Sequence, residues 1–286
     1  MNKKQKELSE AIKKLVEEAN FSLRFDLKRL IADAFSKETK KMPKQALGWI
    51  LENAKIAKKN KIALCQDTGL PIVFIEAGRK QEIDSSFINT IKREVSRYYK
   101  DNYLRRSIVD PLVREKPKYQ GVLTHLQFLP QTKKTRITLF PKGFGSENKT
   151  QLKMFNPTAG INQIEDFIVD AVKQAGPESC PPFFLGIGIG GTSDHALFLA
   201  KKALINRVDL ANPDKHLDAL EKRILKKVNK LKIGPMGFGG KFTALAAKIK
   251  KCPTHIAGLP VGVNISCHAL RSASLEIDYR GKTTTV

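Results

Sequence analysis

The sequence has 286 residues, of which 41% are hydrophobic and 28% are charged. A chain of this length can bury a substantial core without disulfides or structural metals. No apolar run approaches the ~20 residues of a membrane-spanning helix, and the charged N-terminus lacks the apolar core of a signal peptide. We therefore expect a cytoplasmic protein without a membrane segment.

The charge balance is strongly basic, with 51 Lys and Arg against 28 Asp and Glu and a formal net charge of +23. Such a charge attracts nucleic acid, an acidic partner or an acidic substrate. The basic residues are spread along the chain, however, without an arginine-rich arm, zinc-finger spacing or an aromatic RNA-binding signature. This distribution favours a lysine-rich solvated surface over a nucleic-acid-binding protein, an alternative that the net charge alone supports.

Apolar periodicity predicts helices through residues 1–60, with Pro43 near the start of the third, whose core covers 46–57. A short apolar strand is predicted over 62–65, and it ends in the polar turn QDTG. The pattern then predicts further elements in the first half of the chain: a strand over 71–77, a helix over 85–100, and strands over 122–129 and 135–140.

The second half opens with the glycine-containing loop PKGFGSEN and continues with alternating strands and helices. The predicted elements are a helix over 164–175, a strand ending in the loop GIGIGG, helices over 193–204 and 216–231, a glycine-rich loop over 234–240 that opens another helix, and a strand over 260–266. Together they predict one α/β domain over residues 1–286. It has a helical N-terminal region, residues 1–60, and a mixed sheet surrounded by helices.

Four cysteines, at positions 65, 180, 252 and 267, are far apart and form no CxxC pair, so no disulfide framework is expected. Cys65 ends a predicted strand, and Cys180 and Cys267 lie at strand boundaries. Three thiolates at one centre indicate either zinc or an iron–sulfur cluster. Structural zinc normally takes four ligands, often as closely spaced pairs, whereas three cysteines on a four-iron cluster leave one iron open as a Lewis acid.

Six segments, in this order, resemble the motifs of the class I fumarase and tartrate dehydratase family. They are CQDTG at 65–69, LRRS at 104–107 with DPL at 110–112, KGFGSEN at 142–148, CPP at 180–182 with the glycine loop at 186–192, IGPMGFGG at 233–240, and NISCHALR at 264–271. One such motif carries little weight, whereas six in the family's order from about residue 60 onward make the resemblance specific.

The resemblance implies a [4Fe-4S] cluster with one iron open to substrate. Its ligands would be Cys65, Cys180 and Cys267, whereas Cys252 matches no ligand motif and is expected to be an ordinary thiol. The backbone groups of Gly143 and Gly145 would line the same cavity.

Further residues gain a role only through the resemblance. Gln66 and Asp67 would hydrogen-bond the substrate near the open iron, and Asp67 is one of two expected catalytic residues. Arg105 would pair with a substrate carboxylate through its planar guanidinium, with the adjacent Arg106 as the alternative. His255 stands at the position of the family's active-site histidine and is the second expected catalytic residue.

The implied reaction is the reversible elimination of water from a C4 2-hydroxy dicarboxylate: malate to fumarate, tartrate to oxaloacetate, or a methylated relative. The sequence does not select among these substrates. In the family, the base that removes the proton comes from a second module, either fused or encoded as a β subunit. Because the sequence ends soon after Arg271, we expect a separate β subunit and a hetero-oligomer, and we expect this chain to be inactive alone.

The loop GIGIGG at 186–191 also satisfies the GxGxxG dinucleotide fingerprint, with Asp209 about twenty residues further on. An NAD-binding oxidoreductase is therefore an alternative. We disfavour it because Asp209 does not end a convincing strand, and because this reading leaves the three cysteine motifs unexplained.

Overall fold

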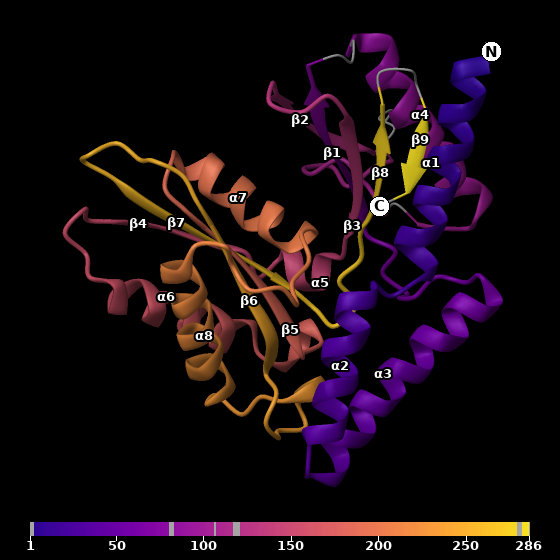
Figure 1. Ribbon diagram of the computed structural model, residues 1–286. Coiled ribbons are helices and arrows are strands. Elements are labelled where there is room, and N and C mark those ends of the chain that lie inside the picture. The colour runs from indigo at the N-terminus through magenta and orange to yellow at the C-terminus, as the bar shows by residue number, and fades with distance from the viewer. Residues whose placement is uncertain (1–2, 80–82, 106, 117–120, 279–281, 286) are drawn as a thin grey trace. The chain divides into compact units, whose positions relative to one another are not determined.

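The computed structural model describes residues 3–79, 83–105, 107–116, 121–278 and 282–285. The chain divides into two compact units (Figure 1). Unit 1 comprises Met1–Arg24, Ala54–Phe144 and Arg271–Val286, and unit 2 comprises Phe25–Asn53 and Gly145–Leu270. Each unit combines helices with one mixed sheet, which confirms the predicted α/β class. Both units draw on separate stretches of sequence, so they are not consecutive domains, and one domain over 1–286 stays a prediction.

Unit 1 is built on the sheet β2-β1-β3-β8-β9. Its strands are β1 (Leu70–Gly78), β2 (Leu123–Leu129), β3 (Thr135–Lys142), β8 (Ala273–Ile277) and β9 (Thr283–Thr285). Strand β1 pairs in parallel with β2 and antiparallel with β3. Helices α1 (Lys3–Phe21) and α4 (Ser85–Asp101) pack together on one face of this sheet, where Val73 and Ile75 join their buried apolar residues in one core.

Unit 2 is built on the sheet β4-β7-β5-β6. Its strands are β4 (Gln151–Phe155), β5 (Phe183–Ile189), β6 (Ala244–Lys251) and β7 (Leu259–Ser266), and its helices include α2 (Phe25–Lys37), α6 (Ile161–Ala175), α7 (Ser193–Ile205) and α8 (Lys215–Asn229). Helices α6 and α8 cover one face and α7 the other (Figure 1). Along the sequence, the division between the units falls within helix α3 (Lys41–Asn60) and within the short helix α5 (Phe144–Glu147).

Alternation along β5 explains the two covered faces of the unit 2 sheet. Leu185 and Ile187 belong to the core beneath α6 and α8. The intervening residues Gly186 and Gly188 face α7, where an added Cβ would lie 2.1 Å from the Ala200 carbonyl oxygen and 1.9 Å from that of Ala196. Because only glycine leaves room for such close approach, these glycines serve helix–strand packing.

Two predicted elements are wrong. Residues 62–65 form no strand, so Cys65 lies in an irregular loop instead of at a strand end; Leu64 is buried there, and its N–H donates to the Asn20 carbonyl at 2.9 Å. The expected helix after Gly240 is the strand β6, which pairs in parallel with β5. Its alanines and lysines favour a helix locally, but the exposed edge of β5 offers strand hydrogen bonds that decide the outcome.

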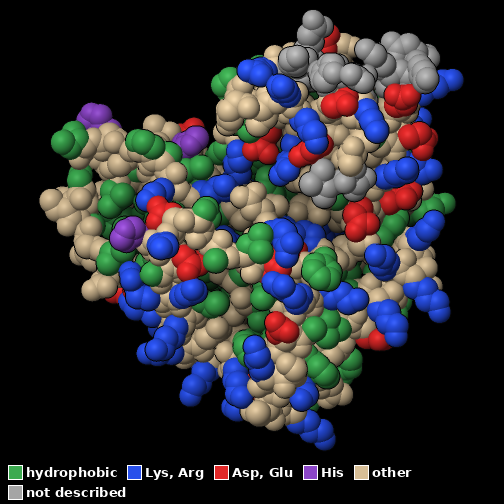
Figure 2. All heavy atoms as spheres, viewed as in Figure 1, with side chains coloured by type: hydrophobic (Ala, Val, Ile, Leu, Met, Phe, Trp, Pro, Cys, Tyr) green, Lys and Arg blue, Asp and Glu red, His purple; other side chains and the backbone are tan. Residues whose placement is uncertain are grey.

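The other predicted helices and strands are confirmed within a few residues at their ends, including the three N-terminal helices and the strand β7 that leads to Cys267. The pattern missed β4, β8 and β9, which are short, and it assigned the helix α5 to a loop. Among the described residues, no helix combines the length and the apolar character that a membrane crossing requires. Figure 2 shows lysine and arginine side chains scattered over the visible face among acidic and hydrophobic ones, as expected for a solvated basic surface.

Candidate active site

The CQDTG loop of unit 1 is organised by the carboxylate of Asp67. Its Oδ1 accepts a hydrogen bond from the Gly69 N–H at 2.9 Å, and its Oδ2 accepts one from the Phe144 N–H at 2.7 Å. Gly69 has a φ of +76°, and a Cβ there would lie 2.9 Å from the Lys142 backbone nitrogen. The motif glycine therefore lets the CQDTG loop approach the segment that carries Gly143.

Arg105 also contacts this loop. Its Nη2 donates to the carbonyl oxygen of Gln66 at 2.6 Å, and its own carbonyl accepts a hydrogen bond from the buried Thr68 hydroxyl. Arg105 and Gln66 are both exposed. One nitrogen thus anchors the guanidinium, while the exposed remainder can meet a ligand. Arg106 lies outside the described residues.

Gly143 completes the polar corner of unit 1. A Cβ built on Gly143 would lie 3.1 Å from Asp67 Oδ2 and 3.8 Å from the Nη2 of Arg271. That same Nη2 donates to the Asp67 carbonyl oxygen at 2.6 Å. Lys142 is buried next to Gly143, and its Nζ donates to the Gly143 carbonyl at 3.4 Å. The structure therefore brings Gln66, Asp67, Arg105 and Gly143 together within unit 1.

The two C-terminal motif cysteines lie together in unit 2. Cys180 precedes β5 and Cys267 follows β7, and these antiparallel strands pair Phe184 with Ser266. The N–H of His268 donates to the Cys180 carbonyl oxygen at 3.2 Å, and the ring Nδ1 of His268 lies 3.1 Å from the same oxygen. Both cysteines are partly buried. Adjacent strand ends thus place two of the three predicted ligands side by side.

Other motif segments surround this corner of unit 2. The Met236 N–H donates to the Pro181 carbonyl at 2.8 Å, so the IGPMGFGG loop lies against CPP. The Ser179 hydroxyl donates to the Gly145 carbonyl at 3.2 Å, which holds the second half of KGFGSEN beside Cys180. In the same motif, Glu147 forms an ion pair with Lys201 of α7.

His255 lies at the opposite end of β7 from Cys267. It lies four residues before Leu259, the first residue of β7. The hydroxyl of the neighbouring Thr254 donates to the carbonyl oxygen of Gly191, just beyond the end of β5, at 3.1 Å. Seven residue steps at about 3.3 Å separate the ends of β7, so His255 and Cys267 are roughly 20 Å or more apart. The exposed His255 ring accepts a hydrogen bond from the Ala257 N–H at its Nδ1, which assigns the proton of the neutral ring to Nε2.

Within the described residues, no group of three or more His, Cys, Asp or Glu side chains lies close enough together to hold a metal ion. Cys65 belongs to unit 1, whereas Cys180 and Cys267 belong to unit 2, so the three-cysteine ligand set stays a prediction. Burial raises the pKa of the Cys252 thiol, which keeps it protonated and fits an ordinary thiol.

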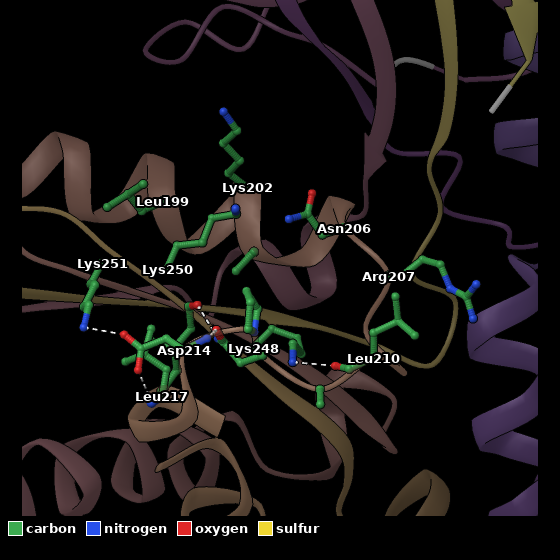
Figure 3. Close-up of a pocket in the computed structure, with 15 residues that line it drawn as sticks. Leu199, Lys202, Asn206, Arg207, Leu210, Asp214, Leu217, Lys248, Lys250 and Lys251 are labelled. Carbon is green, nitrogen blue, oxygen red and sulfur yellow. Dashed lines mark hydrogen bonds and ion pairs between the residues drawn. The ribbon is translucent and has the colours of Figure 1, made fainter. Parts of the chain in front are cut away.

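A cavity of about 500 Å³ in unit 2 contains none of the predicted site residues (Figure 3). Its lining is rich in lysine, but much of that charge is already paired. The Lys251 Nζ lies 2.6 Å from Asp214, and Lys248 binds both Glu221 and the Leu210 carbonyl. This cavity is therefore not the candidate active site.

The dinucleotide-binding alternative finds no support. Gly186 and Gly188 lie under α7 in strand β5 and cannot cradle a phosphate. The carboxylate of Asp209 is enclosed and lies 2.6 Å from Arg207 and 2.5 Å from Arg29, and hydrogen bonds from Arg207 lower its pKa. Asp209 thus has a structural ion-pair role instead of a free carboxylate for a ribose.

Sequence reasoning gave no role to Arg271, although it closes the NISCHALR motif. Only 2% of this residue is exposed, and it contacts the predicted catalytic Asp67. The available signal was its place in a family motif, but neither spacing nor periodicity indicated its contact with a loop some two hundred residues earlier.

Comparison with known proteins agrees with the motif order. A relative from Methanocaldococcus jannaschii, provisionally named L(+)-tartrate dehydratase subunit alpha, is 41% identical over 96% of this chain and 99% of its own length. The L(+)-tartrate dehydratase subunit alpha of Escherichia coli K12 is 25% identical over 83% of this chain and 80% of its own. The anaerobic class I fumarate hydratase of that organism is 28% identical over 92% of this chain but only 50% of its own.

The chain thus spans nearly all of one similar alpha subunit and about half the length of a class I fumarate hydratase. A family model described as fumarate hydratase (Fumerase) matches residues 9–276, which include every motif and every predicted site residue. On this match, the chain belongs to the fumarate hydratase (Fumerase) family.

Proposed function

We propose that this chain is the cluster-binding alpha subunit of an iron–sulfur hydro-lyase that reversibly dehydrates a C4 2-hydroxy dicarboxylate. The observation that carries the proposal is the end-to-end similarity to a protein named as a tartrate dehydratase alpha subunit, at 41% identity. The geometry supports it, since the polar motif residues gather in unit 1 and two motif cysteines gather in unit 2.

The proposed cluster ligands are Cys65, Cys180 and Cys267. Neighbouring, partly exposed cysteines at the ends of β5 and β7 are the donors that iron–sulfur clusters take. When bound, the cluster would supply a Lewis-acidic iron for the substrate hydroxyl. The chain's own residues would orient the substrate.

The exposed edge of Arg105 would bind a substrate carboxylate, since its other nitrogen is anchored to the Gln66 carbonyl. The backbone groups of Gly143 and Gly145 would line the same cavity. Asp67 would hydrogen-bond the substrate, with both carboxylate oxygens fixed by backbone N–H groups. Holding a reacting group in one orientation in this way can lower a barrier by several kcal/mol, to about 7 or more in the best cases.

The proposed partner is a separate β subunit that supplies the proton-abstracting base. Support comes from the relatives named alpha subunits and from the class I fumarate hydratases, of which this chain covers about half. The chain's formal charge of +23 would speed association with an acidic partner.

The test is an anaerobic titration of the iron-reconstituted chain with its purified β subunit. We expect negligible turnover of malate or tartrate by the chain alone and full turnover once β is in excess, followed by absorbance of the unsaturated product or oxaloacetate. Full activity of the chain alone would reject the two-subunit assignment. No activity of the iron-loaded complex on any C4 2-hydroxy dicarboxylate would reject the hydro-lyase assignment.

The catalytic role proposed for His255 requires a second copy of the chain, because His255 and Cys267 lie at opposite ends of β7 within unit 2. Mixed oligomers test this role. Cys267→Ser and His255→Ala chains should each be inactive, and random pairing of the two in a dimer should restore about a quarter of the wild-type activity. No restoration in confirmed mixed oligomers would remove His255 from the reaction.

A further inference from the structure

Arg271 is a buried cation with unused hydrogen-bonding capacity. Only 2% of the residue is exposed, and its Nη2 donates to the Asp67 carbonyl oxygen at 2.6 Å. Its Nε and Nη1 are buried and have no hydrogen-bond partner among the described residues. Burying a guanidinium without satisfying its N–H donors destabilises the folded protein, so a role other than stabilisation is indicated.

The contact of Arg271 is directed at the backbone of the residue that organises the CQDTG loop. The Asp67 carboxylate accepts hydrogen bonds from the Gly69 and Phe144 N–H groups. Together with the Arg271 Nη2, three donors therefore fix both the peptide and the side chain of Asp67. A Cβ on Gly143 would lie 3.1 Å from Asp67 Oδ2, a tight contact, and 3.8 Å from the Arg271 Nη2, an ordinary van der Waals contact, so Gly143 leaves room for the Asp67 carboxylate beside Arg271.

Direct binding of substrate to Arg271 does not fit this geometry. The Nε and Nη1 atoms are both buried, so a substrate carboxylate would have no room beside them. Arg105 differs because it is exposed. The buried guanidinium must act through the residue it holds.

We propose that Arg271 is a positioning residue that fixes the orientation of Asp67 for the dehydration reaction. The proposal rests on the proposed function. Without the Nη2 hydrogen bond, the Asp67 peptide can rotate, and its carboxylate then leaves the Gly69 and Phe144 N–H groups. A substrate contact misplaced by about 1 Å costs on the order of 100-fold in rate.

The experiment compares Arg271→Gln and Arg271→Lys with wild type, with Arg136→Gln as the matched control. Arg136 is an arginine of the same unit whose guanidinium pairs with Glu276 at the sheet surface. For Arg271→Gln in the complex with β, we expect kcat to fall by about 10- to 100-fold with KM within about threefold, at unchanged iron and sulfide content. Arg271→Lys should recover part of kcat, because an ammonium can still donate to one carbonyl.

A second readout needs neither iron nor substrate. In the iron-free chain, amide hydrogen exchange at Gly69 and Phe144 should accelerate about tenfold in Arg271→Gln, with core amides of β1 and β3 unchanged. Arg136→Gln should alter neither kcat nor these two amides. If Arg271→Gln does not fold, the same measurements of kcat and of amide exchange on Arg271→Lys test the proposal.

Wild-type kcat in the Arg271 variants, or unchanged exchange at both amides, would overturn the inference. Uniformly faster exchange across unit 1 would also overturn it, because that result means a purely structural role. A wild-type complex without turnover is a different failure and would count against the proposed function instead.

Discussion

The two regions that carry the family motifs are fixed by different kinds of contact. In unit 1 the CQDTG loop depends on side chains: the Asp67 carboxylate, the Arg105 and Arg271 guanidiniums and the Thr68 hydroxyl all bind backbone groups. In unit 2 the cysteine corner depends on the main chain, through β5–β7 pairing and the bond from the His268 N–H to the Cys180 carbonyl.

This difference predicts where each region is vulnerable. A loop held by a few side chains can lose its geometry through one polar substitution, even if the unit stays folded. A corner held by backbone hydrogen bonds tolerates changes of its own side chains, and only damage to the packing of the sheet displaces it. The predictions below run from complete loss of a property to a shift of about 1 kcal/mol.

The largest effect is expected for the cysteines. Cys65→Ser, Cys180→Ser and Cys267→Ser should each abolish the cluster, whereas Cys252→Ser should retain it, measured by iron, sulfide and the absorbance of anaerobic protein. In the iron-free chain, Cys180→Ser and Cys267→Ser should change the free energy of unfolding by less than about 0.5 kcal/mol, because the corner is held by its backbone. A cluster that survives in any of the three, or is lost only in Cys252→Ser, contradicts the ligand assignment.

Gly188→Ala tests the packing beneath the cysteine corner. The new Cβ would lie 1.9 Å from the Ala196 carbonyl oxygen, so α7 must move away from β5. We expect a loss of about 3 kcal/mol or more in the free energy of unfolding, measured by chemical denaturation. Gly258→Ala is the control, because no atom lies within 4 Å of its added Cβ, and its stability should stay within about 0.5 kcal/mol of wild type.

Arg105→Lys tests the CQDTG loop of unit 1, which is fixed by side-chain hydrogen bonds. Lysine keeps the charge but cannot bind the Gln66 carbonyl and a substrate carboxylate with one planar group. We expect a higher KM and a lower turnover in the reconstituted complex, together costing on the order of 1–3 kcal/mol, or about 5- to 150-fold in kcat/KM. Arg106→Lys should cost less, and kinetics of Arg105→Lys equal to wild type would remove Arg105 from the site.

The smallest effect on stability is expected for Asp209, the acidic residue of the dinucleotide-binding alternative. Hydrogen bonds from Arg207 hold the pKa of Asp209 below its ordinary value of 3.8, so its ionised form stabilises the fold above about pH 4, and this contribution is lost as the pH falls further. Asp209→Asn should cost about 1 kcal/mol at pH 7, since both arginines are half exposed. The difference from wild type should shrink as the pH falls below about 4, and a difference that does not change with pH there would contradict the ion-pair role.

Most of the secondary structure could be predicted because long amphipathic periods dominate helices such as α4 and α6. The wrong predictions fall on segments whose secondary structure depends on whether another strand is available to pair with them. Residues 62–65 look like a strand but have no sheet partner, and Cys65 is therefore in a loop. The segment that forms β6 carries helix-favouring alanine and lysine, yet the free edge of β5 draws it into the sheet.

The sequence by itself determined the family, the α/β class and the identity of the motif residues. These depend on residue types, their order and their periodicity, which can be recognised in the sequence alone. Only the tertiary structure decided which of these residues meet. Hydrogen bonds between distant segments place Asp67 against Gly143 and Arg271, and antiparallel pairing places Cys180 beside Cys267. The same pairing places His255 at the other end of β7, because a strand of fixed rise keeps its two ends apart however close they are in sequence.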